Sequence, residues 1–386
     1  MSKAKIDLNN LDKSNWKTYR FDEIAQNISE RVDPNNTDLT VYIGLEHLDS
    51  ESLHIKRHGT ADDVNGTKLR FYKGDIIFGR RRAYQRKAGI ATWDGFCSAH
   101  ALVLRAKPDV IDPELFPFFL HSDLFMNRAV DISVGSLSPT INWGTLKHQE
   151  FKVPPINIQK KLYQILKSKD FFIQSEIKTL SKIEIVKSSI FNKLHELRYE
   201  NYVNLEDLCK KISSGGTPNR AKEGEYFNGD VKWVKTKELN DWLIEDTEEK
   251  ITLEGLKNSS AKLYPPKTIL LAMYGVTVGK IGIIQKEMAC NQACCALIVD
   301  ETKVEHWFLF YYLIALRKRL IALSVGSAQP NISSGIIKKL KVPNLAMHAQ
   351  IEFSRKLRQL DETKSTLKAN IKSSKSLSNS LLNKVF

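Results

Sequence analysis

The sequence lacks a long apolar run. No stretch reaches the ~18 consecutive apolar residues that a membrane-spanning helix needs, and the first residues, MSKAKIDLNNLDKSNWK, contain no apolar segment typical of a signal peptide. Cysteine is scarce and odd in number, with five in 386 residues. Secretion and membrane insertion are therefore not indicated, and reduced thiols in a cytoplasm fit these features best.

Motifs of common catalytic and metal sites are also missing. A phosphate-binding loop needs four residues between its first glycine and a Gly-Lys pair, but only three separate Gly275 from Gly279. The cysteines at 290, 294 and 295 lack Cys-x-x-Cys spacing and a nearby histidine pair, so we interpret them as core thiols and predict no metal site. Isolated acid–base candidates are interpreted as structural: His100, His121 and Asp123.

Acidic residues are too few to balance the basic ones. The chain has 58 Lys and Arg against 44 Asp and Glu, which gives a formal charge of +14. A protein this basic most often meets a polyanion, usually nucleic acid and sometimes a membrane surface. A basic scaffold that binds no DNA stays open as an alternative. The carboxylates at 245–246 and 248–249 have no second matched carboxylate on an apolar strand, so we interpret them as a surface charge run rather than a nuclease site.

What the sequence does contain is one motif twice. The repeat covers residues 134–162 and 325–353, and its first 14 positions share seven identities at an offset of 191. These are Val134, Gly135, Ser136, Pro139, Ile141, Gly144 and Lys147, which recur as Val325, Gly326, Ser327, Pro330, Ile332, Gly335 and Lys338. Gln159 and Gln350 keep the offset, as do Asn192-Lys193 and Asn383-Lys384. The chain therefore consists of two copies of one design, a globular part followed by a long helix.

Matched segments also run through the globular parts. Each copy has a short lead-in, a first strand, a turn that feeds a buried apolar strand, a further strand and an aromatic-rich helix that we interpret as core. The pairs are 16–24 with 202–208, 41–49 with 231–239, 71–78 with 263–271, 89–105 with 282–299, and 114–125 with 305–316. The segment SGGTP (214–218) predicts a tight, exposed loop. We expect an α+β protein with two pseudo-symmetric mixed α/β domains.

Two long helices are predicted at 159–197 and 350–386. The first follows Pro154-Pro155 with Asn157 as a plausible cap, and its 39 positions would span roughly 58 Å. Each carries an apolar stripe near heptad spacing, interrupted in the second helix by Ser374 and Ser378. The stripes include Ile173, Ile177, Leu180, Ile183, Ile190, Leu194 and Leu197, and Leu360, Lys364, Leu367, Ile371, Leu381 and Val385. The repeat favours an antiparallel coiled coil with the domains at opposite ends; each helix folding back on its own domain is the alternative.

Taken together, these segments resemble those of a known family. The order of domain, helix, domain, helix is similar to the specificity subunit of type I restriction–modification systems, and the resemblance covers the whole chain. The segments that carry it are GLEHLD (44–49), GDIIFGRRRAYQRKA (74–88), CSAHALVLR (97–105), SGGTP, WVKTKEL (233–239), YGVTVGKIG (274–282), NQACCAL (291–297) and VGSAQPNI (325–332), with both VP-to-glutamine helix entries.

The resemblance implies that different segments of the chain have different roles. It implies target recognition domains at 1–156 and 200–347, each reading one half of a bipartite DNA site, and spacer helices at 157–199 and 348–386 that fix the gap. The helices would dock two N6-adenine methyltransferase subunits, joined by restriction/translocase subunits. This chain would be non-catalytic and bind no cofactor, while the partners use S-adenosylmethionine, ATP and Mg.

A DNA-modifying enzyme, or a fragment of one with an unrecognised catalytic site, is the alternative from another class. An amino-methyltransferase like the family's partner would carry an Asn/Asp-Pro-Pro-aromatic motif. The two Pro-Pro sites here are flanked by Tyr264 and Lys267 and by Val153 and Ile156, so they do not match.

Candidate DNA contacts lie where the copies differ most. Cations on phosphates supply affinity, whereas arginine pairs with guanine and glutamine with adenine at base edges. In the first domain we predict contacts from Arg80, Arg81, Arg82, Tyr84, Gln85, Arg86 and Lys87. A solvated basic loop is the alternative there.

The second domain offers glycine-rich segments with few cations. We predict contacts from Gly215, Gly216, Thr217, Lys235, Lys237, Tyr274, Thr277 and Lys280, against the alternative that these glycine loops are only turns. The turns at 139–142 and 330–333 are equally compatible with DNA contact and with a helix start.

Overall fold

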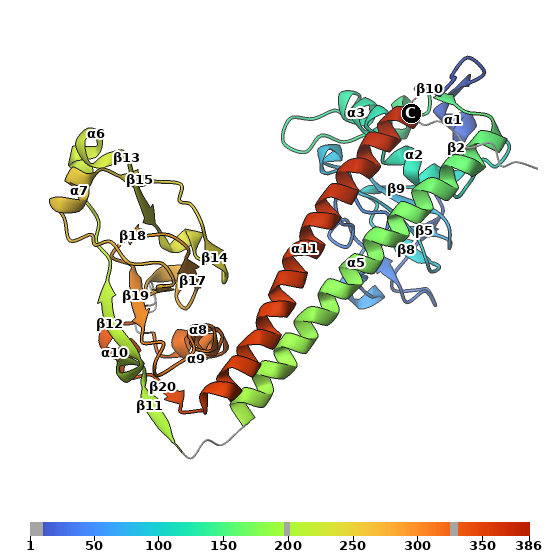
Figure 1. Ribbon diagram of the computed structural model, residues 1–386. Coiled ribbons are helices and arrows are strands. Elements are labelled where there is room, and N and C mark those ends of the chain that lie inside the picture. Colours follow the sequence, from blue (N-terminus) through green and yellow to red (C-terminus); the bar gives the residue numbers. More distant parts are fainter. Residues whose placement is uncertain (1–10, 197–200, 325–330) are drawn as a thin grey trace, which may run out of the picture. The chain divides into compact units, whose positions relative to one another are not determined.

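The computed structural model of the protein describes residues 11–196, 201–324 and 331–386. The chain divides into two compact units: unit 1 comprises the residues up to Thr179 together with Leu367–Phe386, and unit 2 comprises Leu180–Thr366. Each unit therefore holds one mixed α/β domain and a part of both long helices (Figure 1). Most of the VGSAQPNI segment, with Pro330, and the predicted stripe residue Leu197 lie outside the described residues.

Unit 1 begins with short strands and closes its domain with three short helices before the long helix, of which only the part up to Thr179 belongs to this unit. Its elements are β1 (Lys17–Arg20), α1 (Phe21–Ile24), β2 (Ala25–Ile28), β3 (Arg31–Val32), β4 (Tyr42–Ile43), η1 (Ala61–Asp63), β5 (Lys68–Phe71), β6 (Ile76–Gly79), η2 (Ala83–Gln85), β7 (Ala88–Ile90), β8 (Gly95–Cys97), β9 (Ala101–Ala106), α2 (Phe116–Leu120), α3 (Asp123–Asp131), α4 (Trp143–Leu146), β10 (Glu150–Val153) and α5 (Ile156–Glu196).

Unit 2 has a similar order with more short helices and one strand of eight residues, and only the part of its final helix up to Thr366 belongs to this unit. Its elements are β11 (Tyr202–Asn204), η3 (Leu205–Leu208), β12 (Cys209–Ser214), η4 (Arg220–Lys222), α6 (Glu223–Tyr226), β13 (Phe227–Val234), η5 (Thr236–Glu238), β14 (Leu243–Ile244), β15 (Lys250–Ile251), α7 (Leu253–Lys257), β16 (Ile269–Ala272), η6 (Gly275–Thr277), β17 (Ile281–Ile284), β18 (Ala289–Cys290), β19 (Cys294–Val299), α8 (His306–Ala315), α9 (Arg317–Ala322), α10 (Ser334–Lys338), β20 (Lys341–Pro343) and α11 (Met347–Val385).

The main sheet has the same strand order in both units. It runs β2-β9-β6-β7 in unit 1 and β12-β19-β16-β17 in unit 2, where β14 is added beside β17. The shared pairings are antiparallel in both. A second sheet contains one parallel pair in each unit, β4 with β8 and β13 with β18. The repeat predicted from the sequence is therefore a repeat of strand order as well.

The central strands are buried on both faces, which explains their unbroken apolar runs. Ile76 and Phe78 of β6 pack in one cluster with Phe119 of α2, while Ile77 between them packs with residues of the second sheet. Strand β16 alternates in the same way between the cluster that contains α8 and the opposite cluster. The aromatic helices are core, as predicted from the sequence.

Two strand predictions were too long. Strands β4 and β13 end at Ile43 and Val234, because the next residues form a turn in which Gly44 N–H donates to His47 Nδ1 and Lys235 N–H donates to Glu238 Oε2. The segments 89–105 and 282–299 are not single strands either. Each is three short strands that belong to both sheets, so the apolar run passes twice through a turn.

A buried glutamine fixes the start of each long helix to its domain. In α5 the amide of Gln159 accepts from Asp112 N–H at 2.7 Å and donates to Val110 O and Pro154 O at 2.8 Å. In α11, Gln350 accepts from Glu305 N–H at 2.9 Å and donates to Leu345 O at 2.7 Å. The expected cap Asn157 is wrong by two positions: α5 begins at Ile156, and Pro155 O accepts the first amides.

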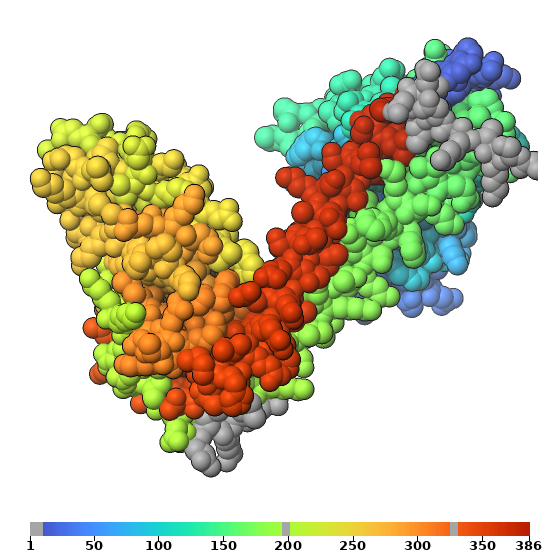
Figure 2. Space-filling model, in the orientation of Figure 1, coloured from blue at the N-terminus to red at the C-terminus, as the bar shows by residue number. Residues whose placement is uncertain are grey.

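In both units the helices pack antiparallel (Figure 1). The early part of α5 meets the end of α11 in unit 1, where Leu162 and Leu166 cluster with Leu382 and Val385. The end of α5 meets the early part of α11 in unit 2, where Lys187 pairs with Asp361 at 2.5 Å and Glu184 with Lys364. The side chains of the two helices meet within each unit (Figure 2).

Repeat-related aspartates tie the helices to other elements. Asp361 of α11 is buried, accepts from the Tyr311 hydroxyl of α8 at 3.0 Å and pairs with Lys187. Its counterpart Asp170 in α5 pairs with His54 of the first domain at 2.8 Å. Burial and the neighbouring carboxylate raise the pKa of Tyr311, so its proton remains available to Asp361. The buried Lys187–Asp361 pair favours one helix register, because a slip would leave its two charges unpaired.

The first described residues and the last ones share one cluster. Trp16 packs with Leu381, Leu382 and Val385. The ring of Phe386 lies 5.1 Å from that of Phe119, measured between centroids. The end of α11 therefore completes the core of unit 1.

Candidate nucleic-acid interface

The basic segment of unit 1 forms a closed loop between β6 and β7, residues 79–87. Gly79 N–H donates to Lys87 O at 2.9 Å and closes it. Inside the loop, Arg82 and Arg86 flank η2 with φ of 55° and 51°. A residue other than glycine in this left-handed region costs of order 1–2 kcal/mol. The loop is therefore held in a conformation that its neighbours must stabilise.

The turn at 139–142 provides that support. Arg82 N–H donates to Pro139 O at 2.7 Å, and Ile141 N–H donates to Arg80 O at 2.9 Å. The same turn leads directly into α4, which begins at Trp143. The turn thus starts a helix and holds the basic loop.

Three consecutive arginines of the loop have no counter-charge among the described residues. Across the described parts of the chain, no carboxylate forms an ion pair with Arg80, Arg81 or Arg82, and Nε of Arg80 is buried without a hydrogen-bond partner. Nε of Arg81 and Nε of Arg82 share the hydroxyl of Ser138 at 3.2 and 3.1 Å. Arg81 and Arg82 are exposed, and Tyr84 is 56% exposed. A dense, unpaired arginine cluster is suited to a phosphate or base edge.

The other two cations of the segment contribute to the fold. Arg86 pairs with Asp123 at 2.6 Å and donates to His121 O at 3.2 Å. Lys87 donates to Leu45 O at 2.7 Å. Gln85 is partly buried inside η2. The structure therefore separates Arg80, Arg81, Arg82 and Tyr84, which remain available, from Arg86 and Lys87, which already have partners.

Unit 2 carries the equivalent loop at 272–280, between β16 and β17. Ala272 N–H donates to Lys280 O at 2.8 Å, and Ile332 N–H donates to Met273 O at 2.9 Å. Tyr274 and Lys280 are exposed, and Val276 is 100% exposed. Thr277 is partly buried and its hydroxyl donates to Tyr274 O at 3.0 Å. The three predicted residues Tyr274, Thr277 and Lys280 thus lie on one loop.

The prediction of an exposed loop at SGGTP is wrong for its two glycines. Gly215 and Gly216 are buried, and their amides donate to Cys294 O and Cys290 O. A Cβ on Gly216 would lie 2.2 Å from backbone atoms of Ser260 and Ala261. These glycines permit close packing of backbones and offer no free amide to a phosphate. Thr217 is partly buried beside them.

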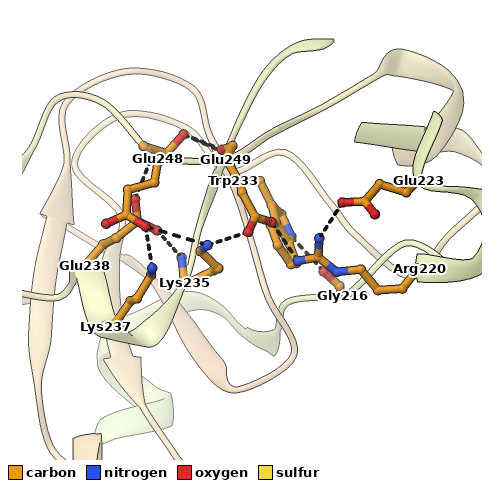
Figure 3. A network of polar contacts seen from close by, with 10 residues as sticks. Gly216, Arg220, Glu223, Trp233, Lys235, Lys237, Glu238, Glu248 and Glu249 are labelled. Carbon is orange, nitrogen blue, oxygen red and sulfur yellow. Dashed lines mark hydrogen bonds and ion pairs between the residues drawn. The ribbon is translucent and has the colours of Figure 1, made fainter. Parts of the chain in front are cut away.

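Lys235 and Lys237 lie in a polar network that the sequence did not reveal (Figure 3). Glu249 accepts from Lys235 and from Arg220, both at 2.6 Å. Glu248 pairs with Lys237, whose hydrogen bond lowers the pKa of Glu248 and raises that of Lys237. The acidic segment predicted as a surface charge run therefore neutralises the predicted DNA-binding lysines.

An aromatic base completes this network. The guanidinium of Arg220 lies 4.1 Å from the ring centroid of Phe227 and 5.4 Å from that of Trp233. The indole N–H of Trp233 donates to Gly216 O at 2.9 Å, which links the network to the glycine pair (Figure 3). Among the described residues, no hydrogen bond or ion pair joins these groups to the loop 272–280.

Replacing Glu249 by glutamine should raise DNA affinity severalfold at low salt. The change removes one negative charge and leaves Lys235 and Arg220 without their shared carboxylate, so the salt dependence should steepen by up to ~1.8 in log–log slope if both reach phosphates. Fluorescence anisotropy against a random duplex at several salt concentrations measures both quantities. Glu301→Gln is the charge-matched control, because Glu301 pairs with Lys267 at the surface. Equal effects of both variants would contradict a phosphate role for Lys235 and Arg220.

Sequence reasoning missed Ser138, Val276, Arg220 and the carboxylates that pair with the lysines. Ser138 and Arg220 give no signal in the sequence, because their partners lie far along the chain. Val276 gives none either, because Val278 lies between the same two glycines and is buried.

Of the acid–base candidates, Asp123 pairs with Arg86 and His121 has a backbone partner, whereas His100 is exposed. His121 Nε2 lies 2.8 Å from Ala88 O, and burial lowers the pKa of the ring. All five cysteines are free thiols, and burial raises the pKa of Cys295 to about 12. No group of three or more potential metal-ligating side chains occurs within the described part of the chain. None of the described helices has the length and apolarity needed to cross a membrane.

Comparison with known proteins agrees with this repeated architecture. The family model described as "Type I restriction modification DNA specificity domain" matches twice, over residues 13–185 and 199–374. The chain belongs to this family. It is a specificity subunit of the type I restriction–modification class, a recognition protein and not an enzyme.

Named specificity subunits align over different lengths. The HindI specificity subunit of Haemophilus influenzae is 21% identical, with 96% of each chain covered. The putative MjaX specificity subunit of Methanocaldococcus jannaschii is 22% identical over 82% of this chain and 79% of its own. The EcoDI specificity subunit of Escherichia coli is 26% identical, but the match spans 47% of this chain and only 41% of that protein.

Solved specificity subunits share the fold at low identity. The type I restriction–modification S subunit from M. genitalium superposes with a TM-score of 0.63 at 16% identity, covering 98% of each chain. A chain solved in work on complex assembly and conformational transition of the type I system gives a TM-score of 0.61 at 19% identity, covering 96% of this chain and 97% of its own.

Proposed function

We propose that this specificity subunit reads a bipartite DNA target, one half-site with each α/β domain, and directs methyltransferase and restriction subunits to it. The observation that carries the proposal is the repeated loop: both units place a closed loop of equal length after the same central strand. In unit 1 that loop carries three arginines that form no ion pair in the part of the chain that the structure describes. Phosphates and guanine edges are the DNA groups that such arginines bind.

The long helices support a spacer role. Two half-sites on one face of a duplex must lie about one helical turn apart, ~34 Å centre to centre, or a multiple of it. Helices α5 and α11 have 41 and 39 residues, and their buried contacts favour a single register. A helix pair has a length set by residue count, so it suits a fixed gap.

The partners and cofactors follow from membership of the family. We propose two methyltransferase subunits, which use S-adenosylmethionine, and restriction/translocase subunits that use ATP and Mg, while this chain binds none of these. Double-stranded DNA is the common ligand. We place the complex in the cytoplasm, where the five free thiols would remain reduced.

The test is selection from a random duplex library by the full chain, followed by gel shifts at low and moderate salt. We expect two enriched half-sites at a constant spacing, and affinity that falls steeply with salt. Enrichment of a single contiguous site would contradict the bipartite reading. Absence of DNA binding at low salt would leave only a basic scaffold.

The alternative of an enzyme with a hidden catalytic site is tested on the same preparation. The purified chain, incubated with S-adenosylmethionine or with Mg and DNA, should neither transfer methyl groups nor cut. Turnover without added subunits would overturn the non-catalytic assignment.

A further inference from the structure

The loops 79–87 and 272–280 share one backbone. Positions 82 and 275 have φ of 55° and 66°, and positions 86 and 279 have φ of 51° and 78°. The closing hydrogen bond and the bond from Ile141 or Ile332 are also the same, at a loop offset of 193. The turns inside the loops differ: Val276 takes the position of Ala83, which is buried. Unit 2 uses glycine at both left-handed positions, whereas unit 1 uses arginine. The side chains differ on a common frame.

The two loops expose different kinds of side chain on this shared backbone. The first loop exposes guanidinium groups and a phenol ring. The second exposes Tyr274 at 41% and Val276 completely, with Lys280 as its only cation. Lone exposed apolar residues are common on protein surfaces. What sets Val276 apart is that it lies on the loop equivalent to 79–87, which carries three arginines that form no ion pair with the described residues.

The edges of DNA bases offer a binding partner for the exposed side chains of each loop. Arginine pairs with O6 and N7 of guanine, whereas thymine alone carries a methyl group in the major groove and is read by apolar contact. We propose that 79–87 and 272–280 are two copies of one base-reading loop, and that Val276 determines specificity by contacting a thymine methyl group. This rests on the proposed function. It assigns a guanine-containing half-site to unit 1 and a half-site with a thymine contact to unit 2.

The experiment uses the full chain and the target selected from the random library. Each thymine of the target is replaced in turn by deoxyuracil, which removes the methyl group and keeps base pairing. At one position the wild-type chain should bind about fourfold more weakly, the effect of one buried methyl group. Val276→Ala should lose this sensitivity, and Val276→Thr, which retains a γ-methyl group, should keep most of it. Val276 is fully exposed, so both variants should melt like the wild type.

A loop graft tests the shared frame. Replacing residues 80–86 by the sequence of 273–279 should give unit 1 the base preference of unit 2 and leave the other half-site and the gap unchanged. A folded graft that retains the original half-site would overturn the equivalence, and sensitivity to deoxyuracil that persists in Val276→Ala would overturn the role of Val276. A graft that fails to melt cooperatively would also count against a common frame. If the wild-type chain selects no bipartite site, the proposed function itself fails.

Discussion

Replacing Arg80, Arg81 and Arg82 together by alanine should weaken DNA binding by roughly 100-fold or more at moderate salt. The three guanidinium groups form no ion pair within the described chain, so their loss removes attraction to DNA and little folding energy. If all three contact phosphates, the log–log slope of affinity against salt should fall by about 2.7. Fluorescence anisotropy across a salt series measures both quantities.

A charge-matched control separates this contact from a general loss of charge. Lys257, Lys262 and Lys286 are exposed lysines of unit 2, and their triple alanine variant loses the same three charges. It should bind almost like the wild type. Comparable losses in both variants would mean that the arginines act only through net charge. Intact DNA binding with lost assembly with methyltransferase subunits would make the arginine cluster a docking surface.

Lengthening both long helices should widen the gap between the half-sites. We expect seven residues inserted after Thr179 in α5 and seven after Thr366 in α11 to add about 10.5 Å, or about three base pairs, because the rise is ~1.5 Å per residue and base pairs are ~3.4 Å apart. Seven residues are close to two turns, so the apolar stripe continues on the same face. Selection from the random library, or sequencing of methylated DNA from cells that contain the partners, gives the gap directly.

Two controls define this prediction. Four residues inserted in α5 alone lengthen one helix without the other, so contacts such as Lys187–Asp361 must shift and the protein should melt earlier. Seven residues inserted at the exposed Gly66 turn should leave the gap unchanged. An unchanged gap in a stable double-helix variant would show that the helices do not set the spacing.

The sequence predicted those features that leave a periodic or repeated trace. The offset of 191 revealed the duplication, and the heptad-like stripe revealed the helices, because burial of one helix face requires that spacing. The aromatic segments that became α2 and α8 were recognised as core for a similar reason: such apolar density requires burial on most sides.

Features that depend on contacts between distant residues left no such trace. Gly216 looks like any loop glycine until the backbone of Ser260 is found packed against it. Lys235 looks available until Glu249 is found on its Nζ, and Arg86 is indistinguishable from Arg82 until Asp123 is found beside it. The sequence shows where these charged residues occur in the chain, but only the fold determines which of them are already paired with an opposite charge.

The ring of Phe386 against Phe119 has a consequence for biosynthesis. During translation the first domain leaves the ribosome well before Leu381, Leu382 and Val385, the residues that complete its core. Its nascent form would keep an apolar face uncovered while the whole second domain is made, a condition that favours chaperone capture. The first domain therefore completes its core only after the second domain and α11 have been made.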